Sequence, residues 1–219
     1  MITRKNSGFL QTYNNVRIAE IEFFHSGDCQ IQFTDGTERR LQIGCEPVYH
    51  VQFGVPASED GKLLYLSSWE TGLTAFDTEN GEKRWSYRST RVGPVFVWQD
   101  YVIAVKYGEK LIQLNASTGS VEQERRSSTL ETAFLLQNGQ IYVNAIKGRD
   151  AIVTPDSLEI IRQFTKKETN PDSCLSHVVT GASLSNGMVE ITGFESGRNR
   201  NPTDTESISF RRILKVYSD

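Results

Sequence analysis

One close pair of residues could bind a metal ion, namely His25 and Cys29, which are separated by three residues. A structural zinc site is tetrahedral and needs more ligands than this pair supplies, and the chain has neither a CxxC nor an HExxH motif. We therefore predict that His25 is a turn residue and that Cys29 packs as a small hydrophobic side chain. The sequence predicts no metal site.

No motif for nucleophilic catalysis is present, because the chain has no GxSxG sequence and no signature of a catalytic Cys-His pair. Glycosidases instead use two carboxylates that flank the bond they cleave. The apolar runs that we assign to inner strands, VYHVQF, PVFVWQ, TAFLLQ and SHVVTG, contain no Asp or Glu. The sequence therefore predicts a protein that is not an enzyme. A hydrolase is a less favoured alternative, which loss of activity on changing a single carboxylate would reveal.

Four hairpin turns carry side chains suited to binding a partner. They join the second and third strands of successive repeat units, at residues 68–71, 107–110, 147–150 and 195–198. Strand alternation places all four turns on one face of the fold, and Trp, Tyr and Arg are the side chains that most often anchor interfaces. We predict a partner-binding surface made of Trp69, Glu70, Tyr107, Glu109, Arg149 and Arg198. Sideways packing of Trp69 on a neighbouring unit is the alternative.

Basic doublets recur in nearly every unit: Arg39-Arg40, Lys83-Arg84, Arg125-Arg126, Lys166-Lys167 and Arg211-Arg212. They could form an electropositive rim for an acidic partner. They could also be charges on outer strands that prevent edge-to-edge pairing, and we favour this second explanation. Three of the doublets, at 83–84, 125–126 and 166–167, are assigned to the fourth strands of their units.

The elements that would position these residues are clearest between residues 62 and 87, KLLYLSSWETGLTAFDTENGEKRWSY. Runs of alternating apolar and polar residues are separated by Gly, Asn and Asp, which is typical of antiparallel strands joined by tight turns. In the turn at 77–81, Asp77 is expected to accept hydrogen bonds from the backbone two residues on, and Gly81 to adopt a positive φ.

This pattern returns along the chain at a spacing of about 40 residues, which is typical of propeller blades. Gly81 and Gly119 end equivalent turns, 119 − 81 = 38 residues apart. The sequence therefore predicts an all-β fold without helices, a small β-propeller of about five four-stranded blades, with four blades as the alternative. We expect a single domain, residues 1–219, with approximate blades at 1–46, 47–90, 91–128, 129–168 and 169–219.

The same stretch resembles the repeat of the PQQ-type (quinoprotein-like) β-propellers. The resemblance lies in Tyr65-Leu66-Ser67-Ser68, Gly72, Thr74-Ala75-Phe76-Asp77, Asn80-Gly81 and Lys83-Arg84-Trp85. It implies a propeller fold and, in the enzymes of that family, a quinone cofactor in a ring of eight blades. None of the quinone-binding residues can be placed on this chain, so we expect no cofactor.

Composition limits the function classes further. A net charge of −3 argues against nucleic-acid binding, and no apolar run is long enough to span a membrane. The N-terminal residues have two positive charges but no apolar region after them, so we expect no signal peptide. The three cysteines, Cys29, Cys45 and Cys174, fit a reducing compartment. The sequence therefore predicts a cytoplasmic location.

Together these observations predict a propeller that binds another protein without catalysing a reaction. The small size and acidic charge suggest an immunity protein that neutralises a basic toxin by charge complementarity. The alternative is a carbohydrate-binding, lectin-like propeller with an aromatic side chain in each unit. Trp69 and Tyr107 fit that pattern, but the turns at 147–150 and 195–198 have no aromatic residue.

Overall fold

The computed structural model describes residues 18–23, 28–42, 57–127, 129–145, 149–171, 176–196 and 207–216. In these residues nearly all regular structure is β-strand, and the one helix is the single turn α1 (Lys166–Thr169). The all-β prediction is therefore confirmed, apart from this turn. No helix in the described part of the chain is long and apolar enough to cross a membrane.

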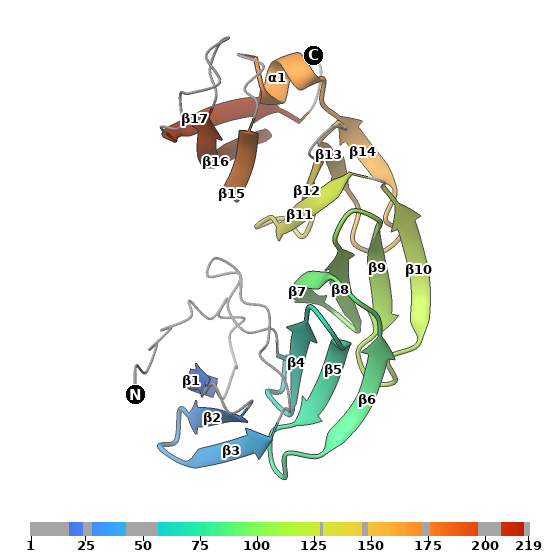
Figure 1. Cartoon of the computed structure of the whole chain (residues 1–219), viewed down its shortest axis with the longest axis vertical. Helices are drawn as coiled ribbons and strands as arrows, with labels where there is room; N and C mark the ends of the chain where they lie inside the picture. The colour runs from blue at the N-terminus through green and yellow to red at the C-terminus, as the bar shows by residue number, and fades with distance from the viewer. Residues whose placement is uncertain are drawn as a thin grey trace. The chain divides into compact units, whose positions relative to one another are not determined.

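The strands form five antiparallel sheets, each built from strands that are consecutive in the sequence (Figure 1). The first sheet contains β1 (Ile18–Phe23), β2 (Asp28–Phe33) and β3 (Glu38–Gln42), and the second contains β4 (Leu63–Ser68), β5 (Gly72–Asp77) and β6 (Lys83–Arg88). The third contains β7 (Val92–Trp98), β8 (Tyr101–Lys106), β9 (Lys110–Asn115) and β10 (Val121–Arg126). The fourth contains β11 (Leu130–Leu135), β12 (Ile141–Ala145), β13 (Ala151–Val153) and β14 (Ile160–Gln163), and the fifth β15 (Ser176–Ser185), β16 (Met188–Ser196) and β17 (Ile208–Lys215).

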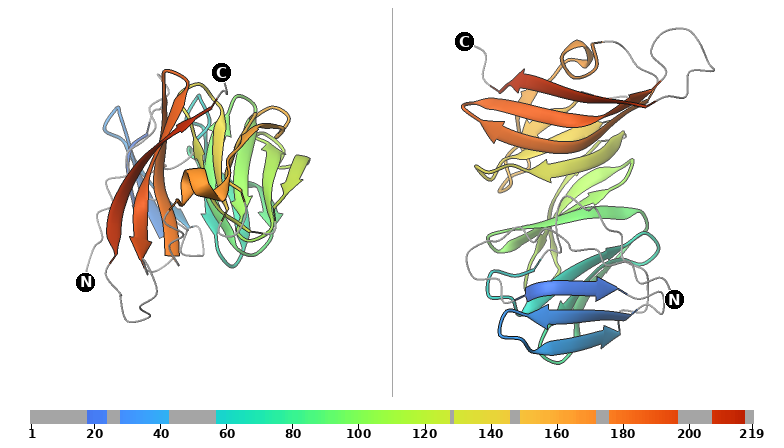
Figure 2. Two further views of the ribbon diagram at one scale, coloured as in Figure 1. Left: turned by 90° about the horizontal axis from the view of Figure 1, so that it is seen from above. Right: turned by 90° about the vertical axis from the view of Figure 1, so that its left-hand side faces the viewer.

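Every described strand lies within one of the five predicted repeat units. The alternation of strand direction is clear for β1 to β3, drawn in blue in Figure 2. Two sheets have four described strands and three have three. The strand predicted at residues 48–53 lies outside the described residues.

The chain divides into two compact units. Unit 1 comprises Met1–Lys106 and Ile112–Glu124, and unit 2 comprises Tyr107–Leu111 and Arg125–Asp219. The boundary therefore runs through strands β9 and β10.

Two turns of the repeat have nearly identical hydrogen bonding. Asp77 Oδ1 accepts from the amide of Glu79 at 2.8 Å, and Asn115 Oδ1 accepts from the amide of Ser117 at 3.0 Å. The turns end at Gly81 and Gly119, whose φ angles are +76° and +72°. The predicted turn chemistry is thus confirmed, because the Asx side chain binds its own turn and glycine takes the left-handed conformation.

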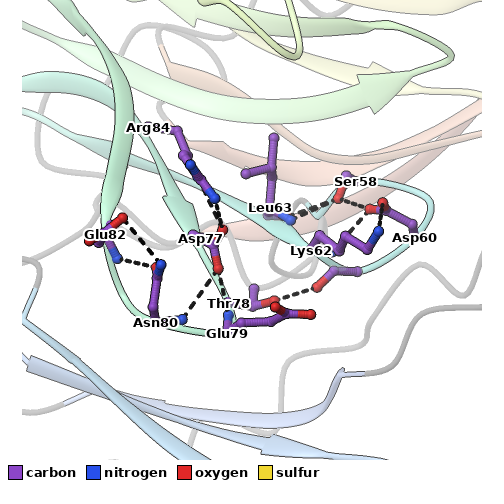
Figure 3. A network of polar contacts seen from close by, with 11 residues as sticks. Ser58, Asp60, Lys62, Leu63, Asp77, Thr78, Glu79, Asn80, Glu82 and Arg84 are labelled. Carbon is purple, nitrogen blue, oxygen red and sulfur yellow. Dashed lines mark hydrogen bonds and ion pairs between the residues drawn. The ribbon is translucent and has the colours of Figure 1, made fainter.

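Asp77 joins its turn to β6, and the adjacent Thr78 joins the turn to the loop before β4 (Figure 3). Its second carboxylate oxygen accepts from Arg84, and Thr78 Oγ1 donates to the carbonyl oxygen of Gly61 at 2.7 Å. Burial would raise the pKa of Asp77, but the hydrogen bonds from Arg84 and from the turn amides hold this pKa below its usual value.

We expect Asp77→Asn to lower the stability of the protein at neutral pH, because the amide cannot form the ion pair with Arg84. Since the folded-state pKa is lowered, this stabilisation is present above the unfolded-state value of about 3.9 and is lost as the pH falls through the lowered pKa. Urea denaturation should therefore give a lower midpoint for Asp77→Asn at pH 7 and converging midpoints below about pH 4. A difference between the two proteins that is independent of pH would contradict this explanation.

Trp85 of β6 lies in a hydrophobic core cluster of unit 1. Its indole Nε1 donates to the carbonyl oxygen of Ala116 at 2.9 Å, and the hydroxyl of Tyr65 donates to the same oxygen at 3.2 Å. The indole ring also covers Gly119 so closely that a Cβ there would lie 2.5 Å from ring carbons. A second cluster of unit 1 contains Cys29, which is fully buried, as predicted.

The structure corrects two assignments near the end of the chain. Lys166 and Lys167 lie in α1 and not in a strand, because Thr165 and Glu168 form a capping box that starts a helical turn. Glu195 was predicted to lie in a turn, but β16 continues to Ser196 and buries Glu195 completely. Pairing of Glu195 with Ile208 in β17 extends the strand beyond the expected end.

Candidate binding site

The predicted binding residues fall in both units. Trp69 and Glu70 lie exposed in the turn between β4 and β5 of unit 1, and Trp69 retains 45% of its surface in solvent. In unit 2, Tyr107 and Glu109 are half-buried and Arg149 is exposed. Arg198, like His25, lies outside the described residues.

The structure brings the Tyr107–Glu109 turn and Arg149 to neighbouring parts of unit 2. The Glu109 carbonyl oxygen accepts from the amide of Ser127 at 2.7 Å, and the Gly108 amide donates to Leu130 at 2.7 Å. Ser127 and Leu130 both line a pocket that Arg149 also lines. The turn therefore supports the wall of this pocket.

The pocket has a volume of about 200 Å³. We call it the arginine pocket; it is lined by Leu111, Arg125, Arg126, Ser127, Leu130, Val143, Ala145, Arg149, Ala151, Val153, Ile160 and Gln163. Sites for drug-sized ligands are usually about 300–1,000 Å³, so the arginine pocket is suited to one or two side chains and is too small for a large cofactor. The lining is apolar apart from three arginines, Ser127 and Gln163, and none of the described residues that line it is acidic.

The three arginines of this pocket differ in their contacts. Arg125 Nη1 donates to the carbonyl oxygen of Leu158 at 2.9 Å, which fixes that guanidinium within unit 2. Arg126 and Arg149 are exposed, and within the described part of the chain no carboxylate forms an ion pair with either of them. Their guanidinium groups can therefore bind an external anion without breaking an ion pair to a described residue.

Buried contacts of Asp150 position the backbone next to Arg149. The Asp150 carboxylate accepts from the Tyr142 hydroxyl at 2.5 Å, from the Ala145 amide at 2.9 Å and from Asn144 Nδ2 at 3.2 Å. Burial raises the pKa of Asp150 even though these hydrogen bonds oppose the shift. The same carboxylate therefore links the ends of β12 and β13 on either side of the turn.

Two further titratable side chains of unit 2 interact electrostatically with one another. Burial, together with the charge of Asp150, raises the pKa of Glu131. Burial, together with the charge of Glu131, raises the pKa of Tyr107. Glu131 lies in β11, the first strand of its sheet. The prediction that the inner strands contain no Asp or Glu is therefore wrong for β11, because this strand begins at Leu130, before the run TAFLLQ.

A second buried group, which we call the Glu195 cluster, consists of His177, Glu195, Arg212 and Phe210. Glu195 Oε1 lies 2.9 Å from His177 Nδ1 and 2.5 Å from Arg212 Nη2, and its side chain is fully buried. Arg212 Nη1 also donates to the carbonyl oxygen of Thr169 at 2.9 Å. The Phe210 ring stacks on His177 and lies 4.5 Å from the Arg212 guanidinium carbon. This cluster joins α1, β15, β16 and β17.

The basic doublets are engaged to different degrees. Arg84 pairs with Asp77, Arg211 with Glu190 and Arg212 with Glu195. Arg126 forms no ion pair with a carboxylate of the described residues. Sequence reasoning could not find this difference, because ion pairing depends on which carboxylates lie nearby in the folded chain. Within the described residues, no group of three or more His, Cys, Asp or Glu side chains could hold a metal ion.

Comparisons with known proteins agree with the fold. Residues 36–161 and 71–198 match the sequence family described as outer membrane protein assembly factor BamB. The crystal structure of BamB from Moraxella catarrhalis is similar to this chain, with a TM-score of 0.60 at 12% sequence identity. That similarity covers 81% of this chain and 56% of BamB, so the chain spans little more than half of BamB. No curated protein sequence matches the chain.

Proposed function

Since the chain belongs to the family of PQQ-type repeat proteins described as outer membrane protein assembly factor BamB, we propose that it is a β-propeller that binds another protein. The observation that carries this proposal is the arginine pocket, whose apolar floor is flanked by the exposed Arg126 and Arg149. Arginine beside apolar surface is typical of interface anchors. We propose that unit 2 contacts its partner there.

We also propose that the five sheets are five blades and that a complete blade has four strands. The four-strand sheets β7 to β10 and β11 to β14 support this arrangement. So does the spacing of 38 residues between Gly81 and Gly119, which end equivalent turns.

We further propose that the partner is a toxin and that binding neutralises it, in the cytoplasm. The acidic net charge of −3 supports attraction toward a basic protein. The arginine pocket itself is positively charged, so it favours a segment of the partner that carries carboxylates. The proposed toxin is therefore basic overall and acidic at the segment that enters the pocket.

The protein-binding function is tested by affinity capture from a lysate of the source organism, followed by titration of the purified partner. We expect a stoichiometric complex that Arg149→Glu weakens by about 2 kcal/mol or more, as for an interface hot spot. Arg88→Glu is the matched control, because Arg88 is also exposed but lies in β6 of unit 1.

The variant Trp69→Ala tests the exposed turn of unit 1 in the same titration. A complex that responds to Trp69→Ala and not to Arg149→Glu would move the binding surface to that turn and leave the protein-binding function intact. Failure to recover any stoichiometric protein partner would refute the function itself.

A further inference from the structure

We infer that the arginine pocket binds an acidic peptide segment in which an aliphatic side chain is flanked by carboxylates. This inference rests on the proposed function in one respect, namely that the segment belongs to a protein partner. It goes further by naming the chemistry of the segment and the side chains that recognise it.

The floor of the pocket accounts for the aliphatic side chain. Val143 and Ala145 of β12 and Ala151 and Val153 of β13 are buried and contribute only methyl-bearing side chains. Ile160 of β14 lines the same pocket and is 39% exposed. An aliphatic side chain that entered this volume would remove apolar surface from water on both partners, which is favourable.

The charges at the rim account for the carboxylates. Arg126 and Arg149 line the pocket without an ion-pair partner among the described residues, and the lining contains no acid that would compete for them. A guanidinium matches a carboxylate geometrically and can donate two parallel hydrogen bonds to it. Acidic residues on both sides of the aliphatic residue would give each of these arginines a partner.

The backbone around the pocket is also held in place. Arg125 donates to the Leu158 carbonyl oxygen, and Arg149 precedes Asp150, whose carboxylate accepts from Tyr142 and the Ala145 amide. Little backbone conformational entropy is therefore lost beside Arg149 on binding, which favours affinity for a short segment. The small volume selects against bulky ligands.

The experiment uses the full chain and fluorescent peptides blocked at both ends, with the central sequences Glu-Leu-Glu, Gln-Leu-Gln and Glu-Ala-Glu. Anisotropy titrations should show that Glu-Leu-Glu binds at least about tenfold more tightly than either other peptide, since it alone satisfies the arginines and fills the floor. In methyl NMR spectra, the signals of Leu130, Val143 and Val153 should shift on addition of Glu-Leu-Glu.

Two variants test the recognising residues. The double change Arg126→Gln and Arg149→Gln should reduce Glu-Leu-Glu binding at least about tenfold, whereas Arg88→Gln should not change it. Ala151→Leu should block the floor, with a thermal melt to confirm folding. Because Arg126 and Arg149 are exposed, the double variant is expected to fold and remains informative if Ala151→Leu does not.

Equal binding of Glu-Leu-Glu and Gln-Leu-Gln, or shifts confined to methyl groups outside the pocket, would overturn the inference. Inorganic phosphate is added as a competitor. If phosphate shifts the same signals while the peptides show no preference, the pocket is a simple anion site and the inference also fails. A stoichiometric partner captured independently of Arg126 and Arg149 would refute the inference alone, whereas tight peptide binding without any captured protein would refute the proposed function.

Discussion

Replacing Arg212 with methionine is expected to lower the free energy of unfolding by about 3–5 kcal/mol, because the buried Glu195 carboxylate loses its ion pair with this arginine. The Glu195 side chain is fully buried, and the Arg212 side chain is only 12% exposed. The change also removes the hydrogen bond to the Thr169 carbonyl oxygen. Urea denaturation at pH 7, followed by circular dichroism, measures the loss.

Arg211→Met provides the matched control. Arg211 is the adjacent residue of β17, but its side chain is 70% exposed and pairs at the surface with Glu190. We expect little change for this variant, because exposed ion pairs contribute little to stability. The double variant Glu195→Gln, Arg212→Met removes both charges and should be more stable than Arg212→Met alone. A single variant as stable as Arg211→Met would show that the Glu195 cluster does not depend on its charges.

Replacing Gly119 with alanine should cost about 2–5 kcal/mol. A left-handed backbone conformation costs a residue with a Cβ about 1–2 kcal/mol, and overpacking adds about 1–3 kcal/mol. At Gly119 the φ angle is +72°, and an added Cβ would lie 2.5 Å from the carbons of the Trp85 ring. Because Trp85 is held by its hydrogen bond to Ala116, the ring cannot move away without losing that bond.

Gly36→Ala separates the two contributions. Gly36 also has a positive φ, +84°, but nothing lies within 4 Å of its added Cβ. This variant should therefore show only the backbone cost of about 1–2 kcal/mol. Equal losses in the two variants would mean that the contact between Trp85 and the turn contributes nothing to the effect at Gly119.

Much of the fold could be predicted from local patterns. Local residue patterns encode two features of the fold. One is the strand with alternating apolar and polar residues, such as β6, and the other is the turn that begins with Asp or Asn and ends with Gly. Both could therefore be predicted from the sequence. Thr165 and Glu168 have the spacing of a capping box, which is a local signal for the start of the helical turn α1. The extension of β16 through Glu195 could not be predicted from local sequence, because Glu195 pairs with Ile208 of another strand.

The candidate site was predictable only in part. Trp69 and Arg149 are both exposed, as expected of residues between strands, and their role in binding stays a prediction. The sequence could not show that Arg149 shares a pocket with Arg126, because those residues come from different sheets. Nor could it show that Asp150 and Glu195 are buried, since a buried acidic residue cannot be told from an exposed one by its residue type.

The sequence by itself thus determined the class of fold, the repeat and its turns, because these depend on side-chain alternation and on φ preferences over a few residues. The tertiary structure alone decided which charges are buried and paired and which arginines are left available at an apolar pocket. Burial and ion pairing depend on packing between strands that are far apart in the sequence.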